Sequence, residues 1–181
     1  ATGGNLTTAR DEGASSQNGL QTAALYFGGY KADPAYNGTE QYDGTSWTAK
    51  NNINTARYSG AGAGTTTAAL YSGGFANPST VSGAVEEWDG TNWASQPNSL
   101  STGRYASGGC GTQTAALVYG GATPTLQTGT ELYNGTSWTN GGVLSTARSY
   151  VAGGVGISTS AICVGGQNSP SPYALTLTEE Y

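Results

Sequence analysis

The chain has 181 residues and a mass of 18.2 kDa, enough for one domain with a buried core. Only 9% of the residues are charged and the net charge is −5, which argues against nucleic acid as a partner because binding phosphates needs clustered lysine and arginine. The sequence holds no histidine, the commonest general base and metal ligand, and no apolar run approaches the roughly 20 residues that cross a bilayer.

Four copies of a short segment ending in arginine divide the chain. The copies end at Arg10, Arg57, Arg104 and Arg148, spaced 47, 47 and 44 residues apart. A period in this range, with short strands and no helical periodicity, indicates blades of a β-propeller. The sequence therefore predicts one all-β domain over residues 1–181. Its blades are expected at about 10–52, 53–99 and 100–143, with a fourth made of 144–181 together with 1–9.

Four antiparallel strands are predicted in each unit. In the second unit, residues 59–64 are glycine, alanine and serine, small enough for an innermost strand near the propeller axis. Residues 67–71 follow as a strand that is apolar on both faces, as expected between neighbouring blades. The third strand ends at Trp88, where Asp89-Gly90 is typical of a two-residue hairpin with positive φ. The fourth strand starts near Trp93.

The two ends of the chain are predicted to share one blade. Aligned on the arginine segments, Ala1 matches Thr139 in a fourth strand, and Tyr181 matches Tyr133 at the end of a third strand. Pairing the two ends would close the ring and remove two exposed sheet edges. A ring of four blades and a larger ring shared by two chains both remain open.

These features together resemble kelch repeats over essentially the whole chain. The resemblance is carried by the doublet Gly73-Gly74, the downstream Trp88 (a tyrosine in the other copies), the Trp93 five residues later, and the lead-in that ends at Arg57. It implies a kelch-like β-propeller. The composition, rich in glycine and threonine, is also similar to kelch arrays of phage tail and other virion-associated proteins, which implies an extracellular or virion-associated location.

Catalysis is not expected. A glutamate lies two residues before the aromatic residue in every unit, at Glu40, Glu86, Glu131 and Glu179. A catalytic pair would be singular rather than copied into each blade, so these carboxylates are expected to accept hydrogen bonds or to pair with arginine. The copper chemistry of the galactose-oxidase relatives of kelch depends on histidine ligands. We therefore expect no catalytic residue, no metal site and no cofactor.

The four arginines are candidates for anion binding. Each lies at the start of an innermost strand, so a ring of guanidinium groups near the axis could hold a sulfate, phosphate or carboxylate. A structural arginine–glutamate pair in each blade is the alternative.

The connections between the second and third strands are the candidate recognition loops. They differ between units and contain five of the six prolines. Exposed aromatic residues in stiff loops suit a sugar ring or a protein partner. The candidate ligand-binding residues are Tyr30, Tyr36, Phe75, Tyr173, Arg10, Arg57, Arg104 and Arg148. The predicted function is non-enzymatic recognition or adhesion. The alternative is a structural subunit of a virion or filament, and either function is compatible with a homo-oligomer.

Two cysteines, Cys110 and Cys163, fall at different positions of different repeats. One disulfide or two buried free thiols are both compatible with the sequence.

Overall fold

The computed structural model describes residues 3–31, 35–76, 80–151, 154–169 and 174–181. Within these ranges all regular structure is β-strand and no helix occurs, which confirms the predicted all-β class. None of the described residues therefore forms a helix long and apolar enough to span a membrane.

Most strands belong to four large antiparallel sheets, one for each unit, numbered here in chain order. The first contains β1 (Ala14–Ser15), β2 (Ala24–Phe27), β3 (Thr39–Tyr42) and β4 (Trp47–Lys50). The second contains β6 (Ala61–Gly64), β7 (Ala69–Ser72), β10 (Val85–Trp88) and β11 (Trp93–Ser95). The third contains β12 (Gly108–Thr112), β13 (Ala115–Tyr119), β16 (Gly129–Tyr133) and β17 (Trp138–Val143). The fourth contains β18 (Val155–Ile157), β19 (Ser160–Val164) and β20 (Thr178–Glu180). The strands of the first three sheets lie where the repeats predict them, whereas the fourth sheet has three strands among the described residues instead of the predicted four.

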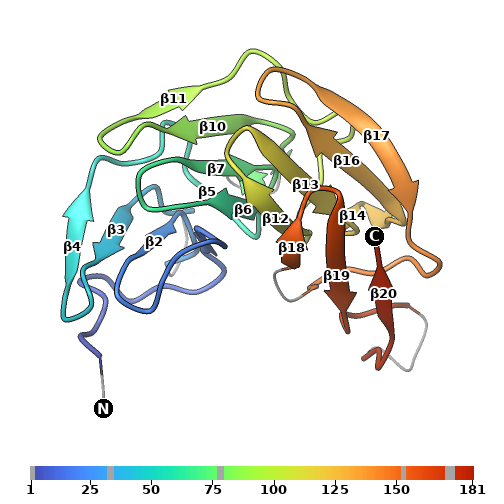
Figure 1. Ribbon diagram of the computed structural model, residues 1–181, viewed down its shortest axis with the longest axis horizontal. Coiled ribbons are helices and arrows are strands. Elements are labelled where there is room, and N and C mark those ends of the chain that lie inside the picture. The colour runs from blue at the N-terminus through green and yellow to red at the C-terminus, as the bar shows by residue number, and fades with distance from the viewer. Residues whose placement is uncertain (1–2, 32–34, 77–79, 152–153, 170–173) are drawn as a thin grey trace.

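Figure 1 shows the four sheets side by side in an arc. The first strands of neighbouring sheets contact one another near its centre, β1 against β6, β6 against β12 and β12 against β18. These contacts explain the small residues of the inner strands. A Cβ on Gly62 would lie 2.3 Å from the Ser15 carbonyl oxygen, and one on Gly109 would lie 3.0 Å from the Ala61 Cβ. Larger side chains would push the inner strands apart.

The expected pairing of the two chain ends is not formed. Among the described residues β20 pairs with β19 alone, and residues 3–13 contain no strand. Instead Gly4 N–H donates to the Thr45 carbonyl at 3.2 Å, and Thr7 donates to the Glu40 carboxylate of the first sheet. The segment before Arg10 thus packs on its own unit, because the glutamate of that unit accepts its hydrogen bonds. The arc stays open, and the termini lie on opposite sides of it (Figure 1).

The turns between the third and fourth strands are longer than predicted. Tyr42 pairs with Trp47 and Trp88 pairs with Trp93, so each loop has four residues rather than two. The aspartate at the start of each loop accepts hydrogen bonds from the two N–H groups that follow the glycine, at 2.8 Å to Asp43 and 2.7 Å to Asp89. The glycine keeps the predicted positive φ, 96° at Gly44. The aspartate cap favours the longer turn.

The core lies at the junctions between neighbouring sheets. At the first junction the Phe27 ring meets the Tyr71 and Trp93 rings edge to face, at centroid distances of 5.1 and 4.8 Å. At the third junction Cys110 and Cys163 lie in one buried cluster as free thiols. The buried-thiol alternative is thus the one that the structure contains.

Candidate functional site

The four arginines do not form an open ring of guanidinium groups. Every arginine side chain is at most 3% exposed and pairs with the glutamate of its own unit. The pairs are Arg10–Glu40, Arg57–Glu86, Arg104–Glu131 and Arg148–Glu179. The structural pair was the alternative that the sequence left open, and it explains why both residues recur in every unit.

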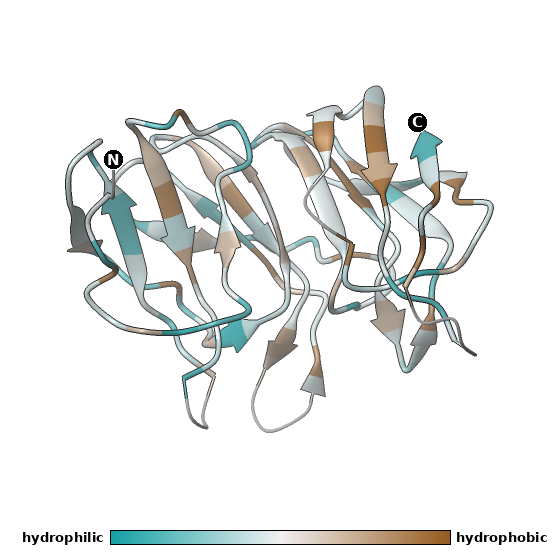
Figure 2. Ribbon diagram, turned by 90° about the horizontal axis from the view of Figure 1, so that it is seen from below, coloured by the Kyte–Doolittle hydropathy of each residue, from teal (hydrophilic) through white to brown (hydrophobic). Residues whose placement is uncertain are grey.

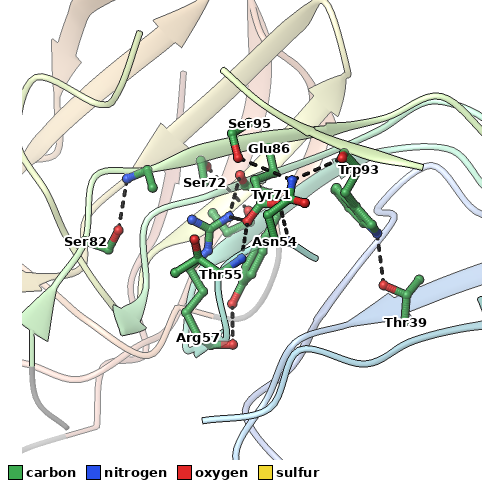
Figure 3. Close-up of polar contacts among 12 residues, drawn as sticks. Thr39, Asn54, Thr55, Arg57, Tyr71, Ser72, Ser82, Glu86, Trp93 and Ser95 are labelled. Carbon is green, nitrogen blue, oxygen red and sulfur yellow. Dashed lines mark hydrogen bonds and ion pairs between the residues drawn. The ribbon is translucent and has the colours of Figure 1, made fainter. Parts of the chain in front are cut away.

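Figure 3 shows the pair of the second unit. Arg57 Nη2 lies 3.1 Å from Glu86 Oε1, and the same carboxylate accepts hydrogen bonds from the N–H groups of Asn54 and Thr55. The Tyr71 ring lies under the guanidinium at 4.4 Å, and its hydroxyl donates to the Arg57 carbonyl at 3.1 Å. Burial raises the pKa of Tyr71 to about 12. The arginine therefore anchors the strand connections and is closed to a ligand.

The loops predicted to carry recognition form short hairpins on one side of the large sheets. In the second unit β5 (Arg57–Tyr58) pairs with β8 (Phe75–Ala76), which pairs with β9 (Thr80–Val81). In the third unit β14 (Ala122–Thr123) pairs with β15 (Thr125–Leu126), and Tyr105 bridges to Ala122. Figure 2 shows short hairpins projecting from this side of the molecule. The pairing confirms that the arginine segments and these loops share one face, here called the loop face.

Four aromatic rings form a continuous row on the loop face. Tyr30 of the first unit lies 5.2 Å from Tyr58 of the second, Tyr58 lies 5.5 Å from Phe75, and Phe75 lies 4.0 Å from Tyr105 of the third. All four residues are half-buried. This aromatic row (Tyr30, Tyr58, Phe75 and Tyr105) crosses three units.

The repeat itself does not require the row. The residue after the arginine is aspartate in the first unit and serine in the fourth, and the residue after the glycine doublet is alanine in the third and glutamine in the fourth. The four aromatic residues occupy half of these eight equivalent positions, and they are the four that lie next to one another. A structural requirement of the fold would place them in every unit.

A hollow opens beside the row, where the four units meet. It has a volume of about 280 Å³, and its lining includes Glu12, Ser59, Ala106, Ser107 and Tyr150. We call it the axial hollow. Each unit places one residue other than glycine in the left-handed backbone region here, with φ of 52° at Glu12, 56° at Ser59, 51° at Ala106 and 49° at Tyr150. Because every unit has this conformation, it belongs to the repeat: the N–H groups of Ser59, Ala106 and Tyr150 each donate to the carbonyl of the equivalent residue in the preceding unit.

The axial hollow presents several polar groups. Glu12 is exposed and its carboxylate accepts a hydrogen bond from the Ser59 hydroxyl. Ser107 Oγ is buried and has no hydrogen-bond partner among the described residues. Tyr150 is 54% exposed, and partial burial, followed by the nearby Glu12 carboxylate and Tyr105, raises the pKa of its phenol. The hollow thus offers a carboxylate acceptor and an exposed tyrosine.

Within the described part of the chain, the structure brings only two of the four predicted aromatic ligand residues together. Tyr30 and Phe75 lie in the aromatic row. Tyr36 lies over the Arg10 guanidinium at 5.2 Å, outside the row, and Tyr173 lies outside the described residues. Sequence reasoning missed Tyr58 and Tyr105. The missed signal was an aromatic residue directly after the arginine in two of the four units.

No group of three or more cysteine, aspartate and glutamate side chains that could hold a metal ion occurs in the part of the chain that the structure describes. No protein-family model matches the sequence, and a search of curated proteins finds no match.

Proposed function

We propose that the chain is a kelch-like β-propeller unit that recognises a glycan through its loop face, without catalysing a reaction. The observation that carries the proposal is the aromatic row lying beside the axial hollow. Supporting the propeller assignment are the radial order of the strands, the glycine doublet and the arginine–glutamate pair in each unit.

The chemistry of the loop face suits a carbohydrate. A sugar ring has an apolar C–H face, which stacks on aromatic rings, and hydroxyl groups at its edge, which need hydrogen-bond partners. The aromatic row provides the stacking surface. Glu12 accepts hydrogen bonds in the axial hollow, and Tyr150 carries a hydroxyl that can donate or accept.

The site is held in place before a ligand arrives. Tyr58 and Phe75 are cross-strand partners in the β5–β8 pair, and Tyr30 and Tyr105 are each held by a β-bridge. Rings fixed by backbone pairing lose little conformational entropy on binding. The loop face therefore presents a stacking surface that needs little rearrangement to bind a sugar.

The test is binding to an array of neutral and acidic oligosaccharides, followed by titration of the strongest hit. Tyr58→Ala should weaken binding about tenfold, because it removes a ring from the middle of the row. Tyr36→Ala is the matched control, a loop tyrosine outside the row, and should leave the affinity unchanged. Equal losses in both variants, or no bound oligosaccharide, would contradict the proposal.

A second candidate function is that of a structural subunit in a virion or filament. It is supported by the exposed valine and isoleucine side chains of β18 and β19. Mass measurement over a range of concentrations tests it, since a strict monomer at high concentration would speak against it.

A further inference from the structure

The two end sheets of the arc carry faces that are buried everywhere else in the molecule. The N-side face of a sheet is the one that contacts the preceding unit, and the C-side face contacts the following unit. The C-side face of the fourth sheet carries Val155, Ile162 and Val164, and the N-side face of the first sheet carries Ala24, Tyr26 and Tyr42. We propose that these two faces are docking surfaces for a further sheet of the same repeat pattern, which completes the ring.

The strand register identifies the C-side face position by position. Val155 pairs with Ile162 as Ala63 pairs with Leu70 in the second sheet and as Cys110 pairs with Leu117 in the third. The four equivalent side chains of the second and third sheets are at most 3% exposed, because the next sheet covers them. Val155 and Ile162 are 74% and 41% exposed. At the internal junctions, such a face is covered by the next sheet of the repeat.

The N-side face of the first sheet follows the same register. Ala24 pairs with Tyr42 as Ala69 pairs with Trp88 and as Ala116 pairs with Tyr133. In the second and third sheets these residues are buried against the preceding sheet, whereas Ala24 and Tyr42 are half-buried.

A repeated hydrogen bond also stops at the ends of the arc. The second glycine of each doublet donates to the carbonyl of the next arginine, Gly29 to Arg57 at 3.0 Å, Gly74 to Arg104 at 2.8 Å and Gly121 to Arg148 at 2.8 Å. The equivalent donor of the fourth unit is Gly166 N–H, and the equivalent acceptor of the first is the Arg10 carbonyl. Neither takes part in a backbone hydrogen bond of this series within the described residues.

A second series runs along the axial hollow and stops in the same way. Ser59 N–H donates to the Glu12 carbonyl, Ala106 N–H to the Ser59 carbonyl and Tyr150 N–H to the Ala106 carbonyl, at 2.7 to 2.8 Å. The Tyr150 carbonyl and Glu12 N–H are the next acceptor and the next donor. The exposed apolar faces and the two interrupted hydrogen-bond series therefore fit the same occupant. It is a sheet with a glycine doublet, an arginine and a residue at the axial hollow placed as in these four units.

The inner strands favour a small number of added units over a second complete copy of the chain. Asn18, just after β1, donates from Nδ2 to the Gly111 carbonyl of the third sheet at 2.9 Å, so first and third sheets meet across the axis. Units around so narrow an axis turn sharply. Figure 1 shows the first and fourth sheets on opposite sides of the arc, with one opening between them.

The experiment extends the chain in register. Tyr181 exchanges backbone hydrogen bonds with Ala161 as Tyr133 pairs with Ala116, so a second copy of residues 134–181 placed after Tyr181 continues the repeat. The reporter is Val155→Cys, with Ala94→Cys as its control because Ala94 is exposed on β11 of the second sheet, away from both ends of the arc. The extension should slow thiol modification at position 155 about tenfold or more and leave position 94 unchanged.

An added segment that carries Ala161→Glu in its own copy should give no protection, because that position contacts the preceding sheet. Equal modification rates at position 155 in the extended and the original chain would overturn the proposal. So would a dimer of the original chain that Val155→Glu dissociates and Ala94→Glu does not, because a second copy would then be the occupant.

A second test compares two variants of the original chain and does not depend on folding of the extended chain. Val155→Glu should shift the melting temperature by about 2 °C or less, since the position faces solvent, whereas Leu117→Glu at the covered equivalent face should abolish cooperative unfolding. A large loss from Val155→Glu in a monomer would show that the face is already covered and would overturn the proposal.

Discussion

Arg104 Nη2 donates to Glu131 Oε1 at 2.8 Å, and both side chains are almost completely buried. Arg104 Nη1 also donates to the carbonyls of Gly120 and Gly129, at 3.0 and 2.8 Å. The glutamate in turn accepts hydrogen bonds from the N–H groups of Ser101 and Thr102. One ion pair thus joins the segment before the inner strand to the second and third strands of the sheet.

Breaking this pair should destabilise the protein strongly. Glu131→Gln removes the charge partner of a buried guanidinium, and the expected loss in free energy of unfolding is about 3–5 kcal/mol. Urea denaturation measures it. The double variant Arg104→Met/Glu131→Leu leaves no buried charge and should lose less than the single variant; a larger loss in the double variant would contradict this account.

The first unit should contribute to acid sensitivity through Glu40. Burial by itself would raise the pKa of Glu40, but hydrogen bonds from Thr7 and the Arg10 guanidinium outweigh it and lower the pKa. A carboxyl whose pKa is lower in the folded state stabilises the protein above its unfolded pKa, and this contribution is lost as the pH falls through the folded value. Glu40→Gln should therefore lower stability at pH 7 and flatten the loss of stability below about pH 4.5. Urea midpoints measured from pH 7 to pH 3 check it, and parallel curves for both proteins would contradict it.

The first glycine of a doublet should not tolerate a side chain. Gly73 has a φ of 69°, and a Cβ there would lie 2.6 Å from the Arg104 carbonyl oxygen of the next unit. Gly73→Ala is expected to cost about 1–3 kcal/mol or more from the backbone conformation and the clash. Gly129→Ala is the control, because its nearest contact would be the Arg104 guanidinium at 3.8 Å. Equal thermal stability of the two variants would argue against the junction described here.

The two thiols should react slowly in the folded protein. Cys110 and Cys163 are buried at the third junction, and burial raises the pKa of Cys110 to about 11 and also raises that of Cys163. Since the thiolate is the reactive form, a colorimetric disulfide reagent at pH 8 should modify both only after unfolding in urea. Rapid modification of either thiol in native buffer would contradict the packing of that junction.

The strands could be predicted from the sequence because the residues that end them act locally. The doublet Gly73-Gly74 and the turn at Asp89-Gly90 need positive φ wherever they occur, so they mark strand ends in every unit. Closure of the ring was not predictable in this way. It depends on how sharply neighbouring sheets turn, which is set by contacts between equivalent positions of neighbouring units, such as Gly62 against Ser15, and a single repeat does not show these contacts.

The candidate site was predicted in part for a similar reason. Tyr30 and Phe75 stood out because they lie in variable loops, whereas Tyr58 and Tyr105 occupy the start of a repeat and resemble structural residues. The row appears only when the residue after one arginine meets the loop of another unit. The arginines drew attention by recurring, but recurrence reflected their pairing with glutamate inside each sheet.

The most direct test of the proposed recognition face is a titration of protein carrying ¹³C-labelled tyrosine rings, followed by NMR, with the strongest oligosaccharide from the array. The account predicts that the ring signals of Tyr30, Tyr58 and Tyr105 shift together with one dissociation constant, and that those of Tyr36 and Tyr42 do not. Shifts confined to Tyr36 or Tyr42, or binding without a change in the three row tyrosines, would contradict it.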